Sequence, residues 1–194
     1  MNHVFDIQYS ESDFIKACIN KQSWALQKLY EDFYPSMYPV CLRYANCEAD
    51  ALDILHDGFI KVFKNLDKYQ INTSLGAWIK RIMVNTSIDY YRRETRRRTS
   101  DIDEIIGVAD KEADVISKMS TEELLNSLQS LTPAYRAVFN LYIVEGYSHK
   151  EIANILGISE STSRSNLVKA RNKLRYFLYH KFNYVKERYS LKKK

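Results

Sequence analysis

The sequence predicts an all-α protein of two small helical domains joined by a flexible acidic linker. Three observations predict this fold class. Apolar residues recur at three- and four-residue spacing over most of the chain, which is the period of an amphipathic helix. Only 5 Gly and 3 Pro occur among 194 residues, few for a loop-rich all-β sandwich. An acidic stretch with little periodicity also separates two basic blocks, and so long a connection is unusual inside one compact domain.

The distribution of charge supports this division. The net charge is −3 over residues 1–70, +5 over 71–98, −6 over 99–123 and +9 over 124–194. One basic run alone is typical of a solvated face, but two of them on helical stripes indicate two anion-binding surfaces on a tether. We expect a first domain over 1–98, a linker over 99–119, a second domain over 120–180 and a basic tail over 181–194.

Composition excludes several classes of protein. The three cysteines, Cys18, Cys41 and Cys47, form no C-x-x-C pair, so neither a disulfide framework nor a zinc site is expected. The N-terminus lacks the basic and apolar regions of a signal peptide, and no apolar run approaches the ~18 residues of a membrane span. The four histidines are scattered, and neither a metal-type pair of carboxylates nor a Gly-rich phosphate loop is evident. We therefore expect a cytoplasmic protein without cofactor or metal, and not an enzyme.

The stretch around residues 50–69 predicts a helix with two distinct faces. Its apolar face comprises Leu52, Leu55, Phe59, Val62, Phe63 and Leu66. The opposite face holds Asp53, Asp57, Ile60 and Lys64. Carboxylates around one apolar residue suit the docking of a basic partner, and a solvated face explains them equally well. Gly58 in mid-helix costs up to ~1 kcal/mol relative to Ala, which indicates the close approach of a neighbour.

The next helix is expected from Ser74 to Arg98, capped by Thr73 or Ser74. Its core face comprises Leu75, Trp78, Ile79, Ile82, Thr86 and Tyr90. A second stripe comprises Arg81, Asn85, Ile88, Arg92 and Arg96, with Tyr91 beside it. Cations interleaved with aromatic rings suit a nucleic-acid strand. A basic helix end that complements its own dipole would explain the last arginines but not Arg81.

The C-terminal block predicts a helix-turn-helix. Thr132 caps a helix that has Pro133 at its first position and ends near Gly146. Ser148 to Glu151 form a capping box that opens a short helix through Leu156. Gly157 makes the turn and Ser159 caps the second helix.

The second helix of this motif has an inward and an outward face. Leu167, Ala170, Leu174, Phe177 and Leu178 are expected inside, and Ser161, Arg164, Ser165, Val168, Lys169 and Asn172 outside. Hydroxyls with Arg and Asn near a helix N-terminus can reach base edges in a major groove. Basic helical hairpins also occur in proteins that bind no DNA, but the agreement of caps, turn and outward chemistry favours DNA binding.

These three segments together resemble the extracytoplasmic-function (ECF) family of bacterial RNA polymerase sigma factors. Asp50 to Tyr69 looks like the family's polymerase-binding helix, Ser74 to Arg98 like its promoter-melting and −10-reading region, and Leu124 to Leu178 like its −35-reading domain. The resemblance covers roughly residues 10–180, in the family's order and spacing. The short linker leaves no room for the middle domain of larger sigma factors.

The resemblance implies a role for individual residues. Polymerase binding is expected at Asp53, His56, Asp57, Phe59 and Ile60; −10 DNA at Tyr69, Arg81, Asn85, Arg92 and Arg96; and −35 DNA at Ser161, Thr162, Arg164, Ser165, Asn166 and Lys169. The family more often has Gln and Glu where this chain has His56 and Asp57, and an apolar residue in place of Ser163.

The resemblance also implies a set of partners. These are core RNA polymerase, through its clamp coiled coil, promoter DNA and an anti-sigma factor, with no membrane insertion and a monomeric free state. A stand-alone helix-turn-helix regulator is the alternative. It would explain residues 124–180, but it gives no role to the Asp53 stripe or to the arginines from Arg81 to Arg98.

Overall fold

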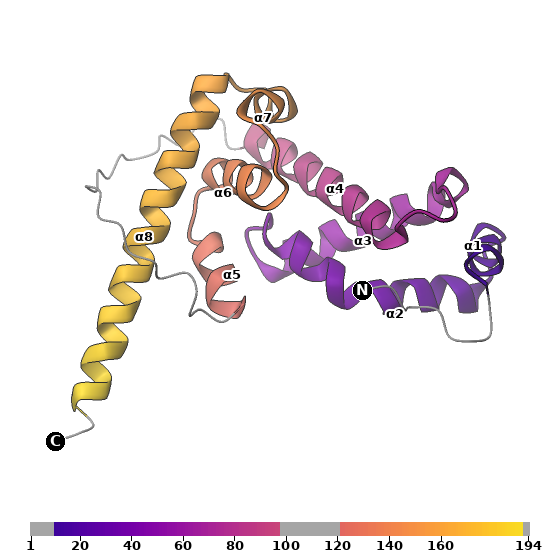
Figure 1. The fold of residues 1–194 in the computed structure, drawn as a ribbon, viewed down its shortest axis with the longest axis horizontal. Coiled ribbons are helices and arrows are strands. Elements are labelled where there is room, and N and C mark those ends of the chain that lie inside the picture. The colour runs from indigo at the N-terminus through magenta and orange to yellow at the C-terminus, as the bar shows by residue number, and fades with distance from the viewer. Residues whose placement is uncertain (1–9, 98–120, 192–194) are drawn as a thin grey trace. The chain divides into compact units, whose positions relative to one another are not determined.

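The computed structural model describes residues 10–97 and 121–191, and every regular element within them is a helix. The chain divides into two compact units, Met1–Tyr90 and Tyr91–Lys194 (Figure 1). The all-α, two-domain expectation is confirmed. The linker expected over 99–119 lies outside the described residues, and the domain boundaries stay predictions.

The first unit contains α1 (Glu11–Ile19), α2 (Ser23–Leu42), α3 (Glu48–Lys64), the 3-10 turn η1 (Leu66–Lys68) and most of α4 (Leu75–Arg97). Its core holds Leu29, Ile54, Leu55, Phe59, Val62, Ile79 and Met83, each no more than 2% exposed. The apolar face predicted around residue 59 is therefore a core face.

Gly58 lies against a close neighbour, as its position in the middle of the helix indicated. A Cβ atom at this residue would lie 2.3 Å from the Sδ atom of Met83 on α4, and Met83 is fully buried. Such a distance is far below van der Waals contact, so glycine is what lets α3 and α4 approach here.

Polar contacts add to the packing of α3 against α4. The hydroxyl of Tyr90 donates to Asp50 Oδ2 at 2.6 Å. Lys61 Nζ lies 2.9 Å from Asp89 Oδ2, in a half-exposed ion pair. Of the two caps that the sequence allowed for α4, Ser74 is the one used: its Oγ accepts from the Ala77 backbone N–H at 3.2 Å.

The three cysteines differ in their surroundings. Cys18 and Cys41 are buried, and burial raises the pKa of their thiols to about 11 and about 12 respectively. Cys47 is exposed at the N-cap position of α3. Cys18 and Cys41 therefore behave as small core residues, consistent with the absence of any disulfide between the three.

The second unit contains α5 (Thr121–Gln129), α6 (Pro133–Phe139), the π-helix η3 (Asn140–Val144), α7 (His149–Leu156) and α8 (Glu160–Leu191). Figure 1 shows α5, α6 and α7 along one side of the long helix α8. Leu128, Leu131 and Tyr135 pack there against Ala170 and Leu174 of α8.

One feature of this unit differs from the sequence prediction. The helix expected to run from 133 to about 146 is α-helical only to Phe139, then widens into η3. Within the predicted basic tail, residues 181–191 are helical and continue α8, and the boundary at 181 stays a prediction. No Gly or Pro follows Gly157, so the sequence contains nothing that would interrupt this helix.

Candidate functional site

The predicted polymerase-binding residues lie along α3, and all but one reach the surface. Asp53 and His56 are exposed, Asp57 is half-buried and Ile60 is 49% exposed. Phe59 is only 2% exposed, because it belongs to the core between α2 and α3. The surface therefore consists of carboxylates, one imidazole and one large apolar side chain.

Aromatic residues of α2 extend this surface. The Tyr30 hydroxyl lies 3.3 Å from Nε2 of His56, and the Tyr30 ring contacts Phe59 at a centroid distance of 4.7 Å. Tyr34 follows Tyr30 at 5.6 Å, and Tyr38 is stacked on Tyr34 at 5.8 Å. These half-buried tyrosines were not predicted as part of the site, although their spacing of four residues on one helix predicts a stripe.

The cationic stripe of α4 is exposed as expected. Arg81, Asn85, Arg92 and Arg96 are all exposed. Ile88 and Tyr91 were expected on or beside this stripe, but they are 5% and 7% exposed and belong to the core. The buried face of α4 is therefore wider than the predicted apolar face, because residues that flank that face are buried as well.

Tyr69 has an environment that the sequence did not predict. The residue is 6% exposed, and its hydroxyl lies 2.7 Å from Glu11 Oε1 and 2.6 Å from the Thr73 carbonyl oxygen. Burial, followed by the hydrogen bond to Glu11, raises the pKa of the phenol. Tyr69 thus fastens the segment before α4 to α1.

The helix-turn-helix in the second unit has the caps that the sequence predicted. Ser148 Oγ accepts from the Glu151 backbone N–H at 3.3 Å, and Glu151 Oε2 accepts from the Ser148 backbone N–H at 2.8 Å. The Ser148 hydroxyl also donates to Glu151 Oε2 at 2.7 Å, and this bond, followed by the one from the Ser148 backbone N–H, lowers the pKa of the Glu151 carboxyl. Gly157 ends α7 with φ 69°, a left-handed conformation that glycine adopts without strain.

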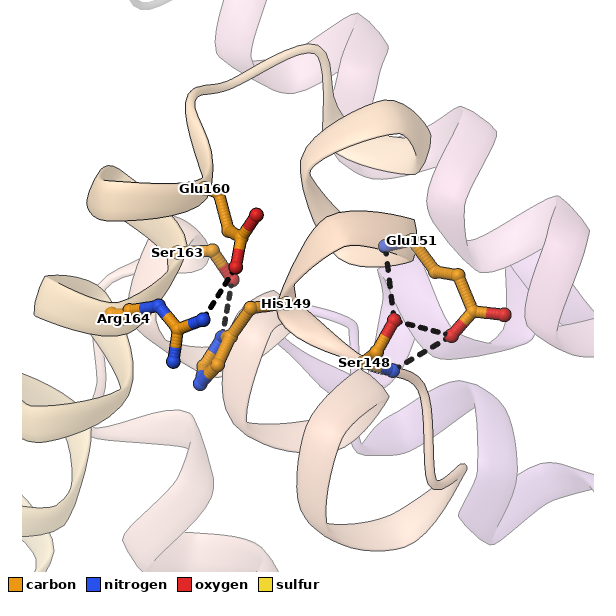
Figure 2. A network of polar contacts seen from close by, with 6 residues as sticks. All are labelled: Ser148, His149, Glu151, Glu160, Ser163 and Arg164. Carbon is orange, nitrogen blue, oxygen red and sulfur yellow. Dashed lines mark hydrogen bonds and ion pairs between the residues drawn. The ribbon is translucent and has the colours of Figure 1, made fainter.

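The first turns of α8 present the predicted DNA-contacting side chains. Ser161, Thr162, Arg164 and Ser165 are exposed, whereas Asn166 and Lys169 are half-buried. Ser159 Oγ accepts from the Thr162 backbone N–H at 3.0 Å and lies 2.8 Å from the Thr162 hydroxyl. Arg164 forms an ion pair with Glu160, one turn earlier (Figure 2).

Further along α8, Lys169 and Lys173 lie over the ring of Tyr135, with Nζ 5.8 Å and 5.3 Å from its centroid. Val168, 56% exposed, lies between these cations and the first turn. Of the five residues predicted to face inward, Leu167, Ala170, Leu174 and Leu178 are buried, and Phe177 is half-buried.

A buried polar contact joins the two helices of the motif. Ser163 is fully buried, and its Oγ lies 2.9 Å from Nδ1 of His149 at the start of α7 (Figure 2). The His149 ring is stacked on Tyr142 of η3 at a centroid distance of 4.4 Å. Desolvation, then the nearby Arg164 cation, lowers the pKa of this imidazole.

The described part of the chain contains neither a metal-type cluster of side chains nor a helix that could span a membrane. Within residues 10–97 and 121–191, no three His, Cys, Asp or Glu side chains gather into a group that could hold a metal ion. No helix in these ranges has the length and apolar character needed to cross a membrane.

Comparison with known proteins identifies both units. Residues 29–97 match the family Sigma-70 region 2, and residues 121–174 match Sigma-70, region 4. Together the two matches cover more than half of the chain and define a sigma factor of RNA polymerase.

Individual relatives indicate the family of sigma factors to which the chain is similar. The chain is 24% identical over 165 residues to the ECF RNA polymerase sigma factor SigM of Mycobacterium tuberculosis, covering 85% of this chain and 83% of that protein. It is 32% identical over 161 residues to the ECF sigma factor SigE of Mycolicibacterium smegmatis, covering 80% and 62%. The chain belongs to the ECF family of RNA polymerase sigma factors, and it directs promoter-specific transcription initiation.

The solved structures that match this chain include the sigma factor RpoE in complex with the anti-sigma factor NepR from Bartonella quintana. The TM-score is 0.46 at 23% identity, with 78% of this chain and 95% of that chain covered.

Proposed function

We propose that the two units divide the work of promoter recognition between three surfaces. The α3 surface binds core RNA polymerase, the α4 stripe binds the −10 element, and the first turns of α8 read the −35 element. One observation carries this division: apart from Tyr69, the predicted contact residues lie on three separate helices, where all but Phe59 are exposed or half-buried.

The polymerase-binding surface is defined here by Asp53, His56, Asp57 and Ile60. An apolar side chain that is 49% exposed and flanked by carboxylates has the composition of an interface centre with a charged rim. Phe59 supports this surface from the core by packing against Tyr30. Charge complementarity then requires a basic partner surface.

A pull-down with core RNA polymerase tests the α3 surface. The Asp53→Arg/Asp57→Arg double variant is expected to lose binding. The matched control is Asp13→Arg/Asp67→Arg, which changes the net charge equally at two exposed carboxylates outside α3. Equal loss by both pairs would refute a defined surface and leave only a general charge effect. No binding by the wild type would favour the stand-alone regulator instead.

The −10 surface is proposed at Arg81, Asn85, Arg92 and Arg96, where exposed guanidinium groups can neutralise the phosphates of a melted strand. Tyr69 is proposed to support this surface indirectly. Its buried ring holds the segment that ends at Thr73, just before α4 begins.

The −35 surface is proposed at the six predicted residues of α8. Arg164 is the strongest candidate for direct reading of a base, because a guanidinium can bond to both acceptors of a guanine edge. Arg164→Ala is expected to weaken binding of the matched −35 element by ~1–3 kcal/mol, the cost of one lost base contact. Run-off transcription should fall on a promoter that depends on its −35 element and persist where that element is dispensable.

We also infer that the protein acts in the cytoplasm and performs no catalysis of its own. The relatives are sigma factors, and the matched structure of RpoE is that of a complex with an anti-sigma factor. We propose that this chain too is held inactive by an anti-sigma factor that competes with core polymerase. Displacement of such a partner by core polymerase in a purified mixture would support this, and a stable ternary complex would contradict it.

A further inference from the structure

The inward face of α8 contains one polar residue at a position where an apolar one would be expected. The buried residues Ser163, Leu167, Ala170, Leu174 and Leu178 follow one another at helical spacing. The first of these, Ser163, is the one that belongs to the turn carrying Thr162 and Arg164. This turn therefore lacks the apolar anchor that the later turns have.

A hydrogen bond takes the place of that anchor. Ser163 Oγ lies 2.9 Å from His149 Nδ1, and the His149 ring is itself stacked on Tyr142. A hydrogen bond depends on direction, whereas apolar packing is largely non-directional. The contacts of His149 with Tyr142 and with Ser163 thus restrain the rotation of the first turn of α8 as well as its distance from α7.

We propose that His149 and Ser163 are positioning residues for −35 recognition. They set the orientation in which Thr162 and Arg164 meet the bases, and they touch no DNA themselves in this role. The inference rests on the proposed function of α8. It concerns discrimination between sequences, because base contacts need closer alignment than contacts to phosphates.

The exposed side of the same turn is consistent with this assignment. Arg164 is paired with Glu160, and Ser159 caps the turn through the Thr162 backbone N–H. These contacts hold the outward side chains relative to α8 itself. Only the bond between Ser163 and His149 orients that first turn relative to α7 among the hydrogen bonds described in this motif.

The test uses full-length protein assembled with core RNA polymerase. A promoter is first selected from a random duplex pool by the wild-type holoenzyme, and a copy is made with a scrambled −35 element. The ratio of the two Kd values measures discrimination. Ser163→Ala and His149→Ala are each expected to lower this ratio about five-fold, the equivalent of one hydrogen bond of ~1 kcal/mol. The double variant should lower it no further, because both changes break the same bond.

Two further variants separate positioning from loss of stability. Ser127→Ala removes another fully buried serine hydroxyl from the same unit, on α5, and should leave the ratio unchanged. His149→Asn carries an amide nitrogen that can stand in for Nδ1, so it should recover part of the discrimination. A ratio within two-fold of wild type for Ser163→Ala overturns the proposal, as does an equal fall for Ser127→Ala.

A measurement on the wild type keeps the proposal testable if a variant does not fold. The ¹⁵N shifts of the His149 ring, recorded by NMR at neutral pH, should show one dominant tautomer held by Ser163. Shifts typical of a free, exchanging imidazole would overturn the proposal. The proposed function fails in a different way: the wild-type holoenzyme would then bind the matched and the scrambled promoter equally.

Discussion

The close approach of Gly58 and Met83 leads to a prediction for Gly58→Ala. Whether this change lowers or raises stability depends on the side chain at position 83. Gly58→Ala adds a methyl group to the middle of α3, where alanine is the better helix former by up to ~1 kcal/mol. The new Cβ atom would lie 2.3 Å from the Met83 Sδ atom, and Met83 is fully buried. One of the two side chains must therefore move.

The expected magnitude follows from these two opposing effects. Forcing an extra methyl group into a packed core costs ~1–3 kcal/mol. Subtracting the helix-propensity gain leaves a net destabilisation of ~1 kcal/mol, or about 4–8 °C in the Tm of a domain of this size. In a Met83→Ala background the space is open, although that change alone costs ~2–5 kcal/mol. Gly58→Ala should there stabilise the first unit by ~0.5–1 kcal/mol.

Urea unfolding followed by tryptophan fluorescence can measure both effects. The 2 tryptophans of the chain, Trp24 and Trp78, both lie in the first unit, so the signal reports on that unit alone. Gly76→Ala is the comparison with a milder contact, because a Cβ there would lie 3.3 Å from Phe33 Cε1, which a shift of a few tenths of an ångström relieves. If Gly58→Ala changes the free energy of unfolding equally in the wild-type and Met83→Ala backgrounds, the close approach of α3 and α4 is not the reason for glycine at position 58.

Three further predictions concern the caps, pH and salt. Ser148→Ala removes the capping box of α7 and should lower the stability of the second unit by ~0.5–2 kcal/mol in thermal unfolding followed by circular dichroism. The folded state lowers the pKa of His149, so the stability that this group supports is present above its unfolded pKa of ~6.5 and is lost as the pH falls below it. The unfolding free energy of the wild type should therefore decrease from pH 7 to pH 5, and that of His149→Asn should decrease less. An identical decrease in the two proteins would refute the assignment of this pH dependence to His149. Glu151, whose pKa is also lowered, loses its contribution only at more acidic pH, as the carboxylate is protonated. Arg81→Ala should reduce the slope of log K for −10 strand binding against log salt by ~0.7, the value for one phosphate on a single strand, and an unchanged slope would exclude a phosphate contact.

Local signals made most of the fold predictable from sequence. Thr132, Ser148, Gly157 and Ser159 each act through the backbone of a few neighbouring residues, and the structure uses all four as predicted. The inward face of α8 was likewise predicted, because helical periodicity alone determines which residues lie on one side.

Features that depend on distant residues were less accessible. Ile88 shares a stripe with exposed arginines, and its burial depends on which distant residues pack against α4. Tyr69 is buried and donates a hydrogen bond to Glu11, 58 residues earlier, a partner that no local pattern indicates. The partner of Ser163 lies 14 residues away across a turn, so the sequence could show only that a polar residue occupies an inward position.

The placement of the three cysteines gives this protein a natural attachment point for a spectroscopic label. Maleimides react with the thiolate form, so the buried Cys18 and Cys41, whose pKa values are raised, should be slow to react. Cys47 is exposed at the start of α3, and six residues of helix place it about 9 Å along the axis from Asp53. A fluorophore on the unaltered chain would thus lie at the edge of the proposed polymerase-binding surface, where docking could be followed in real time.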